Sequence, residues 1–189
     1  MFEGDHNLIS IKLPTFNSEK LYHIDHMFYE CNSLKSVDLS HFNAPILSNT
    51  RCLFSYCHSL EYVNFTGFNA PKIEDMFYMF AKCYSLKSVD LSSIISNGTI
   101  YSVNYMFTDC SSLTSVNLSN ITPKLIHSSE TIFNECPNLT YIDMSSYEKT
   151  NFETMFNRLP PEGHIIIKSN FFKLMKEDIP KDWWIKIVD

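Results

Sequence analysis

The sequence predicts a right-handed solenoid of the α/β class, with a parallel sheet on one face and turns of helix on the other. Two observations lead to this fold. An apolar residue followed by phenylalanine recurs at an almost constant interval, and the same order of cysteine and leucine positions follows each copy. Within each copy, a spacing of three residues gives way to a spacing of two, as expected where a helical turn leads into a strand.

The repeat has six copies that are 26 or 27 residues apart. A constant period of about 20–29 residues is typical of leucine-rich-repeat solenoids. A further apolar pair, Met155 and Phe156, comes early and marks the end of the regular period. The six copies begin at Met1, Met27, Leu53, Met79, Met106 and Ile132.

Each unit is predicted to contain one helical or 3₁₀ turn, one short strand and a return segment. Phe28, Cys31 and Leu34 are three residues apart, so they share one face of a helical turn. Val37 and Leu39 then alternate as in a half-buried strand. No unit can bury both of its apolar faces alone, so the units are expected to stack. The equivalent strand pairs are Ile11/Leu13, Val63/Phe65, Val89/Leu91, Val116/Leu118 and Ile142/Met144.

The shared core of these units, M-F-x-x-C-x-x-L-x-x-V-D-L-S, resembles the BspA-type leucine-rich repeat of bacterial surface proteins. The resemblance covers residues 1–159. The first unit departs from it, because Asp5 stands where the other units have cysteine. The resemblance implies a role in adhesion and partner binding at a cell surface. We expect a protein or glycoprotein as the partner, and no cofactor.

Residues 160–189 break the period and are expected to cap the solenoid, because its last coil would otherwise expose the core. The predicted order is a strand over 164–168, a short helix within 169–180 and a strand over 183–189. Alternation in the final strand predicts that one of Trp183 and Trp184 packs into the core. The predicted domains are therefore a solenoid, 1–159, and a cap, 160–189.

Five of the six cysteines occupy the same position in successive units. They are not spaced as the close pairs that bind zinc. Their Cβ vectors would point the same way in a parallel stack, which is poor geometry for a disulfide. We therefore expect small buried core residues at Cys31, Cys57, Cys83, Cys110 and Cys136.

One outward column of the predicted sheet is polar and has two interpretations. Asparagine separates the carboxylates along most of it, so the column could be a solvated ladder that avoids repulsion between like charges. It could also be a polar binding face for a partner, a cation or a sugar. The column consists of Lys12, Asp38, Asn64, Asp90, Asn117 and Asp143.

The neighbouring outward column combines tyrosine with small hydroxyl residues. Tyrosine gives a large contact area at a low entropic cost, which is typical of recognition surfaces. It is also an ordinary strand residue. If the sheet binds a partner, Tyr62 and Tyr141 are the expected anchors. The column consists of Ser10, Ser36, Tyr62, Ser88, Ser115 and Tyr141.

Composition and motifs narrow the function classes. The net charge is -6 and the basic residues are scattered, which argues against a nucleic-acid-binding surface. No apolar run reaches the roughly 18 residues of a membrane-spanning helix. No common catalytic motif is present, and a regular solenoid offers a shallow face rather than a cleft, so we expect no enzyme activity. The sequence favours a non-catalytic recognition module; an intracellular interaction scaffold or effector and a structural spacer are the alternatives.

The first ten residues, MFEGDHNLIS, lack the basic and apolar regions of a secretory signal peptide. Either the protein is cytoplasmic, or the chain is a fragment of a larger surface or secreted protein. We expect the second, because Met1 falls in register with the repeat. The oligomeric state is not predicted.

Overall fold

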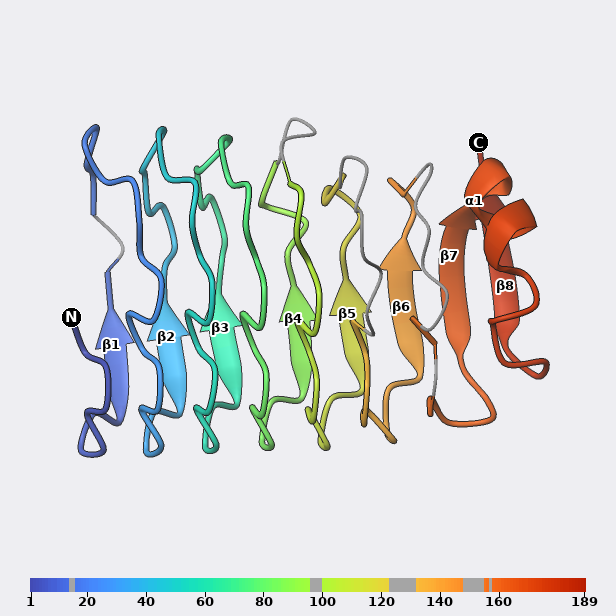
Figure 1. The fold of residues 1–189 in the computed structure, drawn as a ribbon, viewed down its shortest axis with the longest axis horizontal. Helices are drawn as coiled ribbons and strands as arrows, with labels where there is room; N and C mark the ends of the chain where they lie inside the picture. The colour runs from blue at the N-terminus through green and yellow to red at the C-terminus, as the bar shows by residue number, and fades with distance from the viewer. Residues whose placement is uncertain (14–15, 96–99, 123–131, 148–154, 157) are drawn as a thin grey trace.

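The computed structural model describes the chain except for residues 14–15, 96–99, 123–131, 148–154 and 157. Figure 1 shows coils stacked along one axis, with the N-terminus at one end of the stack and the C-terminus at the other. Each coil contributes one short strand to a row. The strands are β1 (Ser10–Lys12), β2 (Ser36–Asp38), β3 (Tyr62–Asn64), β4 (Ser88–Asp90), β5 (Ser115–Asn117), β6 (Tyr141–Met144), β7 (His164–Lys168) and β8 (Trp184–Val188).

The strands form two parallel sheets, β1-β2-β3 and β4-β5-β6-β7-β8, and β3 also contacts β4. The register follows the repeat, since Ile11 is opposite Val37 and Val37 is opposite Val63. Equivalent residues of successive units therefore lie side by side across the row of strands. The prediction of a leucine-rich-repeat solenoid is confirmed.

A column of phenylalanine rings runs through the core. Successive rings are nearly parallel, and their centroids are 5.3 to 5.8 Å apart. Phe42 and Phe68, from the return segments, form a second stacked pair at 5.2 Å. Phe28 and every later member of the first column are buried, whereas Phe2 is only half-buried because it belongs to the first coil. The column consists of Phe2, Phe28, Phe54, Phe80, Phe107 and Phe133.

The segment that precedes each strand is built from successive hydrogen-bonded turns instead of the expected helical turn. The Cys31 N–H donates to the Phe28 carbonyl at 3.1 Å, and the Leu34 N–H donates to the Cys31 carbonyl at 3.0 Å. Glu30 lies inside the first of these turns, just before Cys31. Its φ is 59°, a left-handed conformation that cannot continue a right-handed helix. In the part of the chain that the structure describes, the one α-helix is α1 (Ser169–Met175), so the α/β label applies only loosely. The equivalent left-handed residues are Tyr56, Lys82, Asp109 and Glu135.

All five column cysteines are buried, as predicted. The structure adds a reason for cysteine that the sequence did not suggest. Each thiol donates a hydrogen bond to a phenylalanine carbonyl of the preceding coil, as from Cys83 to Phe54 at 3.1 Å and from Cys110 to Phe80 at 3.1 Å. This buried position therefore favours a side chain that is small and can donate a hydrogen bond. The remaining bonds are Cys31 to Phe2, Cys57 to Phe28 and Cys136 to Phe107.

The column cysteines should resist thiol labelling in the native protein. Burial raises the pKa of Cys136 to about 12 and raises the pKa of Cys83 well above its ordinary value, so almost no thiolate is present at neutral pH. Cys52 lies outside the column and is half-buried. Burial also raises the pKa of the Cys52 thiol, so we expect Cys52 to be modified slowly in the native chain but before any column cysteine, and all six cysteines to be modified after unfolding, as counted by mass spectrometry with iodoacetamide. Rapid native labelling of the column would contradict its burial.

The C-terminal residues continue the sheet. Strand β7 pairs with β6 in parallel, β8 pairs with β7 in parallel, and α1 contacts both of these last strands. Trp183 is buried and donates its indole N–H to the Pro160 carbonyl at 2.9 Å, whereas Trp184 points outward. The expectation that one of the two tryptophans packs inside is confirmed. The division into a solenoid, 1–159, and a cap, 160–189, stays a prediction.

Candidate recognition surface on the sheet

The predicted site residues lie in two outward columns of the row of strands. Tyr62 is opposite Ser36, and Tyr141 is opposite Ser115, in the register that the repeat predicts. Tyr62 is 54% exposed and Tyr141 is 38% exposed. The polar column lies two residues further along the same strands, so both columns face solvent on the same side. The structure therefore brings all eight predicted residues to one face.

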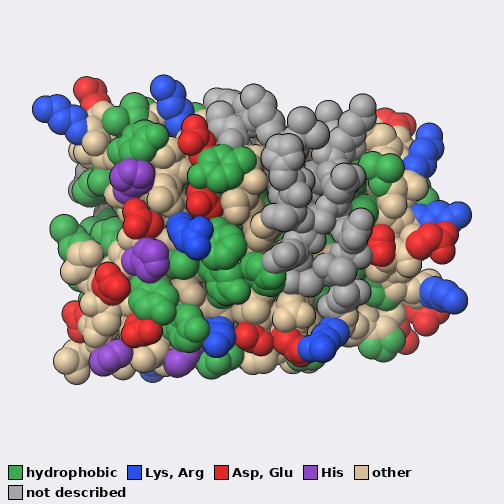
Figure 2. Space-filling view, in the orientation of Figure 1, with side chains coloured by type: hydrophobic (Ala, Val, Ile, Leu, Met, Phe, Trp, Pro, Cys, Tyr) green, Lys and Arg blue, Asp and Glu red, His purple; other side chains and the backbone are tan. Residues whose placement is uncertain are grey.

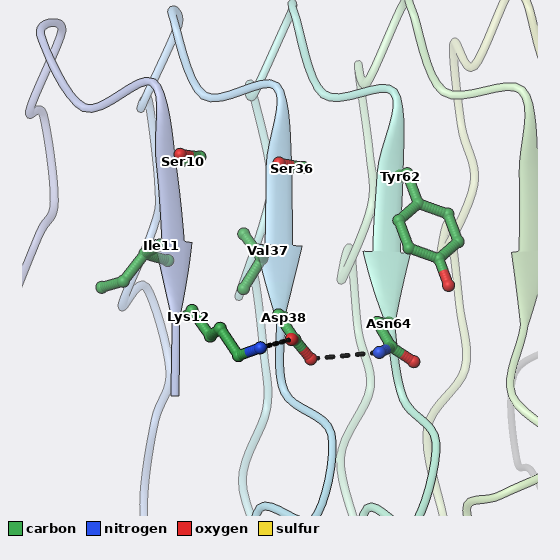
Figure 3. A pocket seen from close by; sticks show the side chains of 8 residues that line it. All are labelled: Ser10, Ile11, Lys12, Ser36, Val37, Asp38, Tyr62 and Asn64. Carbon is green, nitrogen blue, oxygen red and sulfur yellow. Dashed lines mark hydrogen bonds and ion pairs between the residues drawn. The ribbon is translucent and has the colours of Figure 1, made fainter. Parts of the chain in front are cut away.

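Small side chains beside each tyrosine leave a shallow hollow. Figure 3 shows the first hollow, where Tyr62 rises from β3 and the serines of β1 and β2 stay low. It encloses about 350 Å³, and Val37 contributes to its lining. The second encloses about 200 Å³ between β4, β5 and Tyr141. These two hollows are similar, since each is lined by one tyrosine together with serine, Asp and Asn side chains, and Tyr62 also lines a smaller hollow between β3 and β4.

The aspartates and asparagines of the polar column lie at the end of their strands, except that Met144 follows Asp143 in β6. The Asp38 Oδ1 atom accepts a hydrogen bond from the Ser40 N–H at 2.9 Å, and Asp90 accepts one from the Ser92 N–H at the same distance. Such a bond to the backbone two residues later forms a local turn, which needs an Asp or Asn oxygen. Asn64, Asn117 and Asp143 make the same bond, to Thr66, Ser119 and Ser145.

Lateral contacts join the first three members of the polar column (Figure 3). The Lys12 Nζ atom lies 3.4 Å from Asp38 Oδ2, and the Asn64 amide donates to Asp38 Oδ1 at 3.1 Å. Hydrogen bonds from Ser40 lower the pKa of the Asp38 carboxyl, and Lys12 lowers it further. These contacts favour the ladder interpretation for Lys12, Asp38 and Asn64.

The structure extends the tyrosine column by two residues that the sequence interpretation missed. Tyr141 is opposite His164, and His164 is opposite Trp184, with the two ring centroids of the last pair 5.6 Å apart. His164 and Trp184 are both exposed. Alternation within 164–168 and 184–188 contained this signal, but the broken period hid which residues lie opposite Tyr141.

Three other features of the described residues bear on the kind of site. Within the described ranges, no group of three or more His, Cys, Asp or Glu residues is arranged to hold a metal ion. No helix among these residues is long and apolar enough to cross a membrane. Figure 2 shows Lys and Arg side chains scattered among acidic ones, so the face in view carries no continuous basic strip.

Comparison with known proteins identifies the repeat. Residues 78–177, more than half of the chain, match the family described as the BspA-type leucine-rich repeat region, in six copies. The chain belongs to this family. Residues 1–94 of this BspA-type chain also match a family described as a Mycoplasma protein of unknown function. Leucine-rich repeats of this type are protein-interaction modules and are typically not enzymes, which agrees with the sequence prediction at this coarse level.

A solved leucine-rich repeat protein from T. pallidum resembles the BspA-type chain with 17% sequence identity and a TM-score of 0.39. The alignment covers 92% of this chain and 79% of the T. pallidum chain. No curated protein matches significantly.

Proposed function

We propose that this BspA-type chain is a non-catalytic recognition module that binds a protein or glycoprotein partner through the outer face of its sheet. One observation supports the proposal most: Tyr62 and Tyr141 stand exposed in a single column, each beside a hollow with serine in its lining. Exposed aromatic residues beside small ones resemble binding hot spots, where a few large side chains supply most of the affinity.

The hollows suit an extended surface contact better than a small buried ligand. A ligand pocket typically buries most of its ligand in a volume of about 300–1,000 Å³, whereas the two hollows are shallow and open. A partner lying across several strands could place side chains in both hollows at once. The spacing of parallel strands puts Tyr62 and Tyr141, three coils apart, at roughly 14 Å from each other.

The proposed setting is adhesion at a cell surface, with this chain secreted or displayed as part of a larger protein. The family resemblance supports that setting, since its members are typically bacterial surface proteins. The same sheet face would serve an intracellular scaffold equally well. The structural turns made by Asp38 and its equivalents support the spacer alternative, because they explain the polar column without a partner.

The proposal can be tested with the chain as bait in extracts of host matrix and cells. We expect a partner that the native chain captures and that a Tyr62→Ser/Tyr141→Ser variant loses, since both contact anchors are then absent. A matched control is Tyr22→Ser/Tyr101→Ser, which removes two tyrosines of similar exposure, 50% and 55%, from the return segments. The control should retain the partner.

Each of the other outcomes rejects the sheet-face proposal. A partner retained by the sheet variant but lost by the control would place the site on the return segments. No specific partner from any extract would favour the spacer.

A further inference from the structure

Among the described residues, strand β8 is the last of the row, and one of its two edges is unpaired. It pairs with β7 on one side, and no strand of the described residues pairs with the other side. Its surroundings are apolar and exposed: Trp184 is 57% exposed, Ile187 is 47% exposed and Leu174 of α1 is 58% exposed. A free edge presents unpaired N–H and C=O groups that can pair with a strand from another chain.

Lys186 lies in the middle of this edge strand and continues the polar column. The register places Asp143 opposite Ile166, and Ile166 opposite Lys186. At the other end of the same column, Lys12 has a carboxylate on its neighbouring strand, with Asp38 at 3.4 Å. No carboxylate among the described residues lies within ion-pair distance of Lys186. A next strand with an acidic residue at this position would supply one.

A second copy of this chain fits the edge poorly. If β1 of another copy continued the sheet in the established register, its Lys12 would lie opposite Lys186. If two copies joined antiparallel through β8 about its central residue, Lys186 would lie opposite itself. Like charges directly opposite each other destabilise a strand pair, so both arrangements are disfavoured.

We propose that β8 binds an extended segment of a partner protein as a further parallel strand, with an acidic residue opposite Lys186. The exposed side chains of Trp184 and Ile187 flank that position and give the incoming strand apolar contacts on either face of the sheet. Trp184 also continues the tyrosine column, but the edge of β8 lies beyond the hollows at Tyr62 and Tyr141, and this proposal does not rest on the function proposed for them.

The chain itself contains a strand of the required kind. Strand β2 lies beside β1 with Asp38 next to Lys12. A synthetic peptide of residues 33–41, SLKSVDLSH, therefore serves as the probe, and the same peptide with Asp38→Lys serves as its matched control.

The test is a charge exchange between peptide and protein, followed by NMR titration of the β8 amides and the Trp184 indole N–H. The native chain should bind the aspartate peptide about tenfold more tightly than the lysine peptide. A Lys186→Asp chain should show the opposite preference. Lys186 is exposed and points away from the core, so this substitution should not disturb folding, which far-UV circular dichroism checks.

Two results would overturn the proposal: no shift of the β8 amides with either peptide, or affinities that the charge exchange leaves unchanged. A Tyr62→Ser/Tyr141→Ser chain should bind the aspartate peptide as the native chain does. This variant separates the two surfaces, so that failure of one proposal leaves the other open to its own test.

Discussion

Replacing Phe80 with alanine should lower the free energy of unfolding by about 3–5 kcal/mol, the usual cost of truncating a fully buried phenylalanine. Phe80 is fully buried in the middle of the stack, with ring centroids 5.3 Å from Phe54 and 5.4 Å from Phe107. Its removal opens a cavity that the fixed spacing of the neighbouring coils cannot close. Urea denaturation followed by circular dichroism measures the loss.

The matched control is Phe2→Ala, at the first position of the same column. Phe2 is half-buried and, among the rings of the described residues, stacks on Phe28 alone, at 5.4 Å. The loss for Phe2→Ala should be clearly smaller than for Phe80→Ala. Equal losses would mean that coil position does not govern packing, against the stacked-coil description.

Replacing Cys83 with aspartate should destabilise the protein at neutral pH by an amount similar to or larger than Phe80→Ala. Cys83 is fully buried, and its thiol donates to the Phe54 carbonyl at 3.1 Å. A carboxylate at this site would have no donor in place of that bond and would face the carbonyl oxygen. An uncompensated buried charge costs about 3–5 kcal/mol.

This cost should depend on pH in a defined direction. Burial would raise the pKa of the introduced carboxyl in the folded state above its unfolded value. The folded variant then binds a proton more tightly than the unfolded chain, so its stability relative to the native protein is highest below about pH 4 and is lost as pH rises. Urea denaturation of both proteins at several pH values checks this. A stability difference between the variant and the native protein that does not change with pH would contradict burial of the side chain at position 83.

Asp5 shows why the first coil tolerates an aspartate at this position of the repeat, whereas an aspartate in place of Cys83 should destabilise the protein. It occupies the equivalent position, but it is only half-buried, and its Oδ1 atom accepts hydrogen bonds from the Asn7 and Leu8 N–H groups at 3.0 and 3.1 Å. The end of the stack thus leaves room for water and local donors, whereas the interior does not.

The core of the fold followed from the sequence because every coil repeats the same physical constraint. A period of 26 or 27 residues sets the register, so Val37 and Val63 had to lie opposite each other, and Cys83 had to lie between its equivalents. The geometry of the turns before each strand could not be predicted from the sequence. A spacing of three residues is shared by helical turns and by successive β-turns, and nothing in the residue type at Glu30 specifies its left-handed φ.

The candidate surface was predicted in part. Alternation placed Tyr62 and Tyr141 outward, where the structure has them. The hydrogen bonds made by Asp38 and its equivalents could not be foreseen, because a bond to the backbone depends on how the chain turns after the strand. His164 and Trp184 were missed because the constant period ends before them: His164 follows Tyr141 after 23 residues and Trp184 follows His164 after 20, instead of 26 or 27.

The most direct test of recognition through the sheet is hydroxyl-radical footprinting of the unmodified chain with the partner that it captures. Tyr62, Tyr141, Tyr22 and Tyr101 are all exposed in the chain alone, so mass spectrometry should find all four oxidised without partner. With partner bound, we expect protection of Tyr62 and Tyr141 and unchanged oxidation of Tyr22 and Tyr101. Protection of Tyr22 and Tyr101, with Tyr62 and Tyr141 still oxidised, would contradict the account.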